Sequence, residues 1–280
     1  MTFPWLTLLG LLPLVGGLIL LLPMRGAARP LGMFIALLTL AMGVGVAVLH
    51  VAGADLSVRV PWISSFGAWW ALDVDGLGLT MVLMAAALVP IVLLAEWKLS
   101  ADTGRWGSQV FFALVLILEG LSVFVFTASD VLLFYLFFEA TLIPMYFLIG
   151  GFGGPRRSYA ATKFLLFSLA GGLIMLASVI GLYGQSVSAN GQASYLLSDL
   201  AAINISGDIG RWLMAGFLIA FIIKAPMVPL HTWLPDAAEE ATPGTSVLLV
   251  GVLDKICTFG IIKFCLGLFP EASVWVTPFM

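Results

Sequence analysis

Charged residues are scarce in this 280-residue chain: Asp, Glu, Lys and Arg make up 10% of it, against about 25% in an ordinary globular domain. Hydrophobic residues make up 61%, more than a water-soluble fold of this size can carry, because its outer layer needs polar side chains. The net charge of −3 comes with no basic patch, which disfavours nucleic-acid binding. The composition therefore predicts a protein whose solvent is lipid.

Cysteine is equally scarce. Cys257 and Cys265 are the two cysteines of the chain, and both lie inside an apolar run. This excludes a disulfide scaffold. The sequence also contains no cysteine cluster and no dinucleotide-binding fingerprint, so it offers no recognisable site for a redox group.

Long apolar runs dominate what remains. A membrane-spanning helix needs about 20 apolar residues, so the chain holds roughly eight or nine spans. The runs are apolar on most faces, which indicates helices rather than the strands of a barrel. We therefore expect an all-α, integral membrane protein built as a multi-pass helical bundle. The runs lie near residues 3–22, 31–50, 76–95, 108–127, 131–150, 158–183, 211–234 and 245–268, and a ninth begins around Ser273.

Basic residues in the loops predict the orientation, because cytoplasmic loops carry an excess of Lys and Arg. One set of alternate loops holds Arg59 and Arg211, and the other holds six basic residues. The N-terminus is therefore predicted to lie outside. Of the two outer loops, 51–75 is expected to form a small hairpin and 184–210 a polar loop around a short surface helix. The six inner residues are Arg25, Arg29, Lys98, Arg105, Arg156 and Arg157.

Several ionisable residues lie inside the predicted spans. Each costs at least about 2.5–3.5 kcal/mol at mid-bilayer, so their presence indicates a function. Counting 1.5 Å per residue along the helices places Glu139, Lys224 and Lys255 about 12–20 Å deep, near the middle of a core about 30 Å thick. We expect these three to form a row along the membrane plane, whereas Lys163 and Lys263 are expected to extend toward the surface. The ionisable residues that we single out inside the predicted spans are Glu119, Glu139, Lys224, His231, Asp254 and Lys255.

The segment KAPMVPLHTWLP, which begins at Lys224, carries three prolines. Proline has no N–H, so the carbonyls of Ile222 and Ala225 are expected to lose their usual partners, and Pro144 is expected to disturb the preceding helix similarly. Free carbonyls at membrane depth are tolerated only inside protein or beside water, and broken helices mark ion paths in transporters. Lys224 and His231 are seven residues apart and are expected to share one helix face.

These residues predict a proton relay. Burial favours the neutral forms of Lys and Glu, whereas pairing favours the charged forms. Lys224 is therefore expected to gain and lose its proton as its distance from Glu139 changes, and Lys255 and His231 to pass protons onward through water. A purely structural reading stays open: a buried ion pair that locks two helices, a satisfied carboxylate at Glu119, and a hydrogen bond from His231 to a backbone carbonyl.

Three stretches resemble a known family. FFEATLIPMYFLIGGFGG, which contains Glu139, and YAATKFLLFSLAGGLIMLASVIGLY resemble the fifth and sixth helices of the subunit M family of proton-pumping NADH-quinone oxidoreductases, the mitochondrial subunit 4. KAPMVPLHTWLPDAAEEATPGTSVLLVGVLDKICTFGIIKF resembles the seventh and eighth. The resemblance covers essentially the whole chain. Mrp-type cation/proton antiporters share the Glu, the broken helix and both Lys, but FEATLIPMYFLIG is closer to subunit M.

The resemblance implies roles for the site residues. The residues matching Glu139 and Lys224 form the pumping pair of the family, Lys255 matches its central hydrophilic axis with His231 nearby, and Glu119 matches a glutamate of its fourth helix. The resemblance also implies an antiporter-like fold with a proline-broken seventh helix, in which about eight or nine of about fourteen helices are present, built around two inverted five-helix repeats. No cofactor is implied in this subunit; NADH, FMN, iron–sulfur clusters and quinone are expected in partner subunits.

The resemblance divides the chain into three expected regions. Residues 1–105 are expected to hold helices 1–3 and the outer hairpin, 106–268 the first proton-translocating repeat, and 269–280 the start of a truncated ninth helix. We expect a fragment of a longer translocase subunit without a redox centre, in a bacterial inner membrane rather than a mitochondrial one, with other membrane subunits as partners. Its expected function is proton translocation coupled to electron transfer from NADH to quinone. The alternatives are an Mrp-type antiporter subunit and a non-pumping membrane scaffold.

Overall fold

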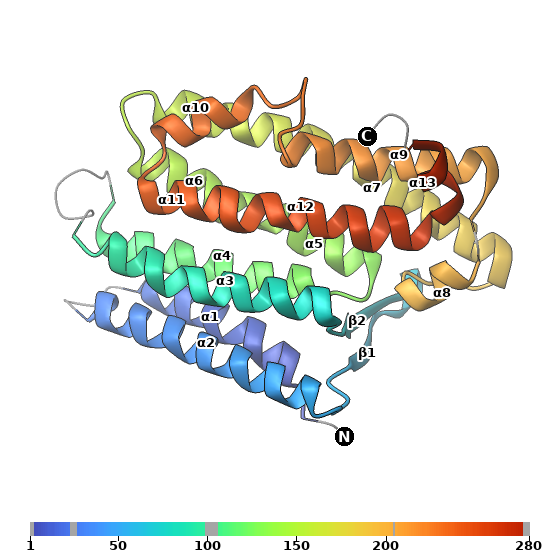
Figure 1. Ribbon diagram of the computed structural model, residues 1–280, viewed down its shortest axis with the longest axis horizontal. Helices are drawn as coiled ribbons and strands as arrows, with labels where there is room; N and C mark the ends of the chain where they lie inside the picture. The colour runs from blue at the N-terminus through green and yellow to red at the C-terminus, as the bar shows by residue number, and fades with distance from the viewer. Residues whose placement is uncertain (1–2, 23–26, 99–105, 204, 277–280) are drawn as a thin grey trace.

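The computed structural model describes residues 3–22, 27–98, 106–203 and 205–276. Long helices lie side by side along one axis, and a two-stranded hairpin covers one end (Figure 1). The predicted all-α membrane architecture is confirmed in outline, since five of the described helical segments are long and apolar enough to cross a membrane. The first part of the chain forms α1 (Trp5–Leu20), α2 (Ala28–Val51), β1 (Val58–Ile63), η1 (Ser64–Phe66), β2 (Ala68–Leu72), α3 (Gly76–Ala95) and α4 (Ser108–Thr127).

The second part contains shorter helices, because breaks interrupt the apolar runs. The run 131–150 is divided at Thr141, three residues before Pro144, and the run 211–234 ends as a helix at Lys224. Two π-helical segments, η3 and η4, interrupt the run 245–268. The elements are α5 (Val131–Ala140), α6 (Leu142–Phe152), α7 (Arg157–Asn190), α8 (Leu197–Ala202), α9 (Gly207–Lys224), α10 (Trp233–Glu240), α11 (Pro243–Leu248), η3 (Leu249–Leu253), α12 (Asp254–Gly260), η4 (Ile261–Leu266) and α13 (Pro270–Val276).

Helix α4 forms the centre of the bundle. Of the residues in its membrane-crossing window, 89% are buried, and α1, α3, α5 and α6 pack around it. Glycines allow α1 to approach α4 closely: a Cβ at Gly120 would lie 2.7 Å from the carbonyl oxygen of Gly10, and one at Gly17 would lie 2.6 Å from that of Ala113. Small residues bring membrane helices together in this way, since lipid-exposed helices gain their stability mainly from close packing.

The hairpin closes one end of the bundle and confirms the prediction for 51–75. Strands β1 and β2 pair antiparallel, and Asp130 ties them to α5: its buried carboxylate accepts the N–H of Trp69 at 2.9 Å and that of Leu133 at 3.0 Å. Burial raises the pKa of Asp130 above its ordinary value, although these N–H groups oppose the shift. Helix α8 lies beside the hairpin as the predicted short helix, while α7 extends to Asn190, beyond the predicted end at 183.

At the end of the bundle opposite the hairpin (Figure 1), two acidic side chains accept backbone N–H groups of other elements. Buried Glu96, at the end of α3, accepts the N–H of Gly244 at 2.6 Å and so caps the start of α11. The backbone N–H of Arg156, before α7, donates to the Glu240 carboxylate of α10 at 2.8 Å. Both contacts hold the chain on the C-terminal side of the break, at the end of α10 and the start of α11. Arg25 and Arg105, used above for the orientation, lie outside the described residues, as do residues 277–280.

Candidate functional site

Helix α9 ends at Lys224, about midway along the bundle (Figure 1). Pro226 cannot donate to Ile222, and the N–H of Met227 donates to the Ile222 carbonyl instead, at 3.1 Å. The Ile222 carbonyl therefore loses its usual partner, as predicted, but it is not free. The chain then continues as turns up to α10, so Lys224 and His231 do not share one helix face; that expectation assumed a continuous helix.

Trp233 completes the hydrogen bonding at the break. Because the N–H of Met227 is taken by its new partner, the Ile223 carbonyl needs another donor, and the indole Nε1 of Trp233 donates to it at 2.8 Å. The indole is 1% exposed and packs against Phe164 of α7, with 5.2 Å between ring centroids. Lys224 is the last residue of α9. The negative, C-terminal end of a helix dipole favours a positive charge such as the Lys224 ammonium.

Lys224 on α9 contacts Glu139 on α5. Its Nζ lies 3.2 Å from Oε1 of Glu139 and 3.1 Å from the backbone oxygen of Phe138, to which it donates. It also lies 3.3 Å from the centroid of the Phe138 ring, in cation–π range. The side chains of the pair are 7% and 16% exposed. The structure therefore brings together the acid and the amine that the sequence placed at mid-membrane.

A glycine pair on α7 makes room for this contact. The carboxylate of Glu139 lies against Gly172, where a Cβ would overlap the carboxylate atoms. At the adjacent Gly171, a Cβ would lie 3.3 Å from the Cα of Ala220 on α9. Sequence reasoning assigned no role to either glycine. The signal was present in the motif SLAGGLIML, since paired glycines in an apolar helix indicate close helix contact.

Three further ionisable side chains have buried polar atoms without a hydrogen-bond partner among the described residues. Both carboxylate oxygens of Glu119 on α4, Nδ1 of His231 and Oδ1 of Asp254 have no hydrogen bond there. Glu119 is 1% exposed. Unpaired buried polar atoms are costly, so their retention needs a reason outside the packing of the described bundle. The hydrogen bond predicted as an alternative for His231 is not made by Nδ1 in the part of the chain that the structure covers.

Lys255 lies on a different face of α12 from the residues nearest the pair. Lys255 is exposed, whereas Cys257, two positions on and about 200° around the helix, is buried and lies within electrostatic range of Lys224 and Glu139. Helix α12 lies between η3 and η4, and π-helical interruptions are frequent at functional sites. The row that joins Lys255 to the pair therefore stays a prediction.

The two lysines expected to extend freely toward the surface form ion pairs. Lys163 of α7 lies 2.6 Å from Asp236 of α10, and Lys263 of η4 lies 2.6 Å from Asp75, the N-cap of α3. Burial raises the pKa of Asp75, but hydrogen bonds from Lys263 and from the N–H of Gly78 outweigh it, so the net pKa lies below its ordinary value. Both pairs join helices that are distant in sequence.

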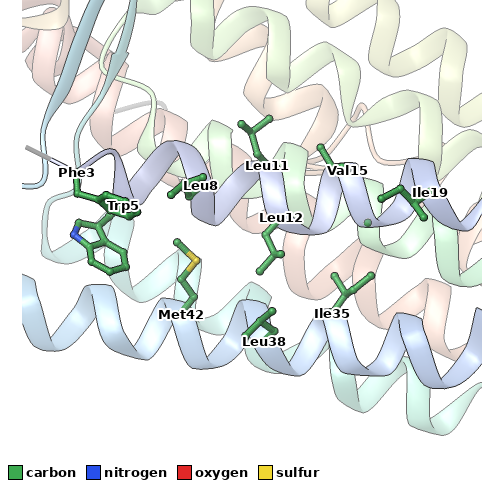
Figure 2. Close-up of a pocket in the computed structure, with 11 residues that line it drawn as sticks. Phe3, Trp5, Leu8, Leu11, Leu12, Val15, Ile19, Ile35, Leu38 and Met42 are labelled. Atoms are coloured by element: carbon green, nitrogen blue, oxygen red, sulfur yellow. The ribbon is translucent and has the colours of Figure 1, made fainter.

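No candidate metal cluster accompanies the pair among the described residues. No group of three or more His, Cys, Asp or Glu there is arranged to hold a metal ion. Figure 2 shows an open groove of about 610 Å³ between α1 and α2, whose lining side chains, such as Trp5, Leu12, Leu38 and Met42, are apolar. None of the side chains that line this groove is titratable.

Comparison with known proteins gives consistent matches. The family model described as "NADH:quinone oxidoreductase/Mrp antiporter, TM" matches residues 128–280. NADH-quinone oxidoreductase subunit M of Mycobacterium tuberculosis is 43% identical, over 98% of this chain and 56% of its own length. The chloroplastic NAD(P)H-quinone oxidoreductase chain 4 of Vitis vinifera is 35% identical, over 99% of this chain and 55% of its own.

Solved structures agree with these matches. A chain of respiratory complex I from Thermus thermophilus aligns with a TM-score of 0.85 and 33% identity, covering 98% of this chain and 55% of that one. A chain of the Mrp complex from Dietzia aligns with a TM-score of 0.77 and 23% identity, covering 97% of this chain and 29% of that one, which shows a common fold alone. The chain thus spans about half the length of the curated relatives it matches.

Proposed function

The chain belongs to the NADH:quinone oxidoreductase/Mrp antiporter family of membrane proteins, and from this premise we propose that it translocates protons as part of a subunit M of an NADH-quinone oxidoreductase. Electron transfer from NADH to quinone takes place in other subunits, which hold FMN and iron–sulfur clusters. Those subunits act on this one through conformation and electrostatics. The chain itself supplies titratable side chains and a bundle able to move them.

The observation that carries this proposal is the buried contact between Glu139 and Lys224 at the end of a broken helix. Buried ion pairs add little stability over well-packed apolar residues, so stability does not account for their presence. While the carboxylate is charged and near, it holds the proton on Lys224. When Glu139 takes up a proton or withdraws, the ammonium loses its counter-charge and releases its proton. The break after Lys224 supplies the freedom for such a change of distance.

Onward transfer is assigned to groups that the pair does not contact directly. His231 carries a buried Nδ1 without a partner in the described chain, and Lys255 lies on the exposed face of α12. We propose that these two pass protons along the membrane plane, and that Glu119 is a further titrating group. In this reading residues 106–268 are one translocating repeat, and the exposed face of α12 meets the part of the subunit that the longer relatives contain.

We further propose a bacterial inner membrane, with the N-terminus and the hairpin on the outer side. Lys98 and Arg156 support this orientation. Lys98 follows the end of α3 and Arg156 precedes the start of α7, and α3 ends and α7 begins at the end of the bundle opposite the hairpin (Figure 1). Cytoplasmic ends of membrane proteins are enriched in such residues. The partners are the other membrane subunits of the oxidoreductase.

The test replaces both partners with apolar residues of similar size. We expect the double variant Glu139→Leu, Lys224→Met to assemble, because an apolar pair packs as well as a buried ion pair. We also expect at least a tenfold loss of NADH-driven proton uptake by inverted membrane vesicles. Lys263→Met is the matched control, because its ion pair with Asp75 lies away from the break. Normal pumping by the double variant would support the scaffold alternative instead.

The Mrp alternative rests on the family description and the common fold. It predicts cation/proton exchange without NADH and no association with NADH dehydrogenase activity. Purification of the full-length protein from its native membrane separates the two. Co-purification with NADH oxidation supports our proposal, and sodium- or potassium-dependent exchange alone supports the antiporter.

A further inference from the structure

The two carboxylate oxygens of Glu139 have different surroundings. Oε1 accepts a hydrogen bond from Lys224 at 3.2 Å, whereas Oε2 is buried and has no partner among the described residues. The carboxylate lies against Gly172, so it borders the backbone of α7 as well as Lys224 on α9. An ionised oxygen that is buried without a donor is strongly unfavourable. Oε2 borders Gly172, as Oε1 does, and it is the oxygen that still calls for a donor.

Ser168 lies one turn before Gly172 on the same helix. Its side chain is 0% exposed, and its Oγ has no hydrogen-bond partner in the described part of the chain. This distinguishes it from other buried hydroxyls, because Ser and Thr in membrane helices commonly donate to the carbonyl four residues earlier. Buried hydroxyls that follow this pattern are Thr39, which donates to Ile35 at 3.0 Å, Ser122, which donates to Leu118 at 2.8 Å, and Thr127, which donates to Val123 at 2.9 Å.

The spacing suits a single bridging water molecule. Ser168 and Gly172 are four residues apart on α7 and share a face, on which Cβ positions lie about 5–6 Å apart. The Glu139 carboxylate lies where a Cβ of Gly172 would be. Two hydrogen bonds of about 2.8 Å through one water span a similar distance. A buried water needs at least two polar partners, and the orphan atoms of Ser168 and Glu139 supply two. We propose that Ser168 Oγ and Glu139 Oε2 hold such a water, and that protons reach Glu139 through it. This inference rests on the proposed function of the pair.

In this arrangement the two carboxylate oxygens of Glu139 have different roles: Oε2 receives the proton, and Oε1 contacts Lys224. A hydronium ion at the bridging position transfers one proton to Oε2 and becomes water, while Glu139 becomes neutral. The Lys224 ammonium, still beside Oε1, then lacks a counter-charge, passes its proton onward to the proposed relay of His231 and Lys255, and becomes a neutral amine. Ser168 neither gains nor loses a proton overall. It is a positioning residue, which holds the water where the transfer occurs and turns Oε2 toward α7.

The experiment uses the assembled complex with Ser168→Ala. The carboxyl stretching band of Glu139, identified as the band that Glu139→Gln removes from the infrared difference spectrum, is expected to shift to higher wavenumber as a hydrogen bond is lost. NADH-driven pumping is expected to slow about fivefold, the size expected for loss of one hydrogen bond. Ser168→Cys keeps a weak donor and is expected to shift the band less. The matched control is Ser122→Ala, whose buried hydroxyl bonds its own helix.

Two results would overturn the inference. An unmoved Glu139 band in Ser168→Ala shows that no water links the two groups, even if pumping falls. A shifted band with unchanged pumping shows that the water is present but does not deliver protons. Failure of the proposed function looks different, because Glu139→Gln itself would then pump normally.

Discussion

The substitution Gly172→Ala tests whether the Glu139 carboxylate must lie against the backbone of α7. The added Cβ would occupy the space of the carboxylate atoms, so the carboxylate has to move. A rotamer change of Glu139 is the cheaper response, at roughly 0.5–1.5 kcal/mol, compared with displacement of a packed helix. Either response lengthens the 3.2 Å contact between Oε1 and Nζ of Lys224.

The magnitude follows from two opposing contributions. Alanine in place of glycine within a helix stabilises folding by about 0.5–1 kcal/mol. Separating a buried charge from its partner costs about 3–5 kcal/mol, which exceeds the gain severalfold. Since each 1.4 kcal/mol corresponds to about a tenfold change in rate, we expect Gly172→Ala to lower proton pumping at least tenfold while the complex still assembles.

The assay compares NADH-driven proton uptake by inverted vesicles with electron transfer from NADH to a soluble acceptor, which reports the amount of assembled enzyme. Gly184→Ala is the matched control, because it lies on the same helix and a Cβ there meets nothing within 4 Å. We expect the control to pump normally. Wild-type pumping by Gly172→Ala would refute the reasoning, since it would show that the observed contact between Glu139 and α7 does not matter for transport.

Two further predictions concern stability. Trp233→Phe keeps a ring packed against Phe164 but leaves the Ile223 carbonyl without its donor. We therefore expect the unfolding free energy in detergent to fall by about 1–3 kcal/mol. Trp212→Phe, whose side chain is 79% exposed, is the control and is expected to leave the unfolding free energy unchanged. The pKa of Asp75 is lowered, so its contribution to stability is present above the ordinary aspartate pKa and is lost as pH falls through the folded value. Asp75→Asn is therefore expected to flatten the acid limb of melting temperature against pH, by a small amount because the side chain is 49% exposed. An unchanged acid limb would contradict this.

Spans that the sequence predicted well share a simple cause. Runs 76–95 and 108–127 coincide with α3 and α4, because an uninterrupted apolar run in lipid has to satisfy its backbone internally as a helix. The break after Lys224 was also predictable in position, since Pro226 removes a donor wherever it lies. The hydrogen bonds at the break could not be predicted. The bond from the Met227 N–H to Ile222 and the bond from Trp233 to Ile223 depend on where α10 packs.

Residues of the site that the sequence did not indicate act through contacts between distant parts of the chain. Glu139 lies over Gly172, and the hydroxyl of Ser168, which we propose to hold a water, does not bond its own helix. Neither property follows from residue type, because other glycines and serines of the chain lie in ordinary helix positions. Lys163 shows the same limit, since its partner Asp236 lies on another helix.

By itself, the sequence determined that the chain is a helical membrane protein, and it predicted that an acid and an amine lie at comparable depth. These properties depend on composition and on distance along the helices, and both can be counted from the residues. Only the tertiary structure decided which groups meet, because helix rotation and breaks set the direction of every side chain. Glu139 and Lys224, 85 residues apart, lie in contact, whereas Lys255 lies on an exposed face of α12 and Cys257, about 200° around that helix, is buried.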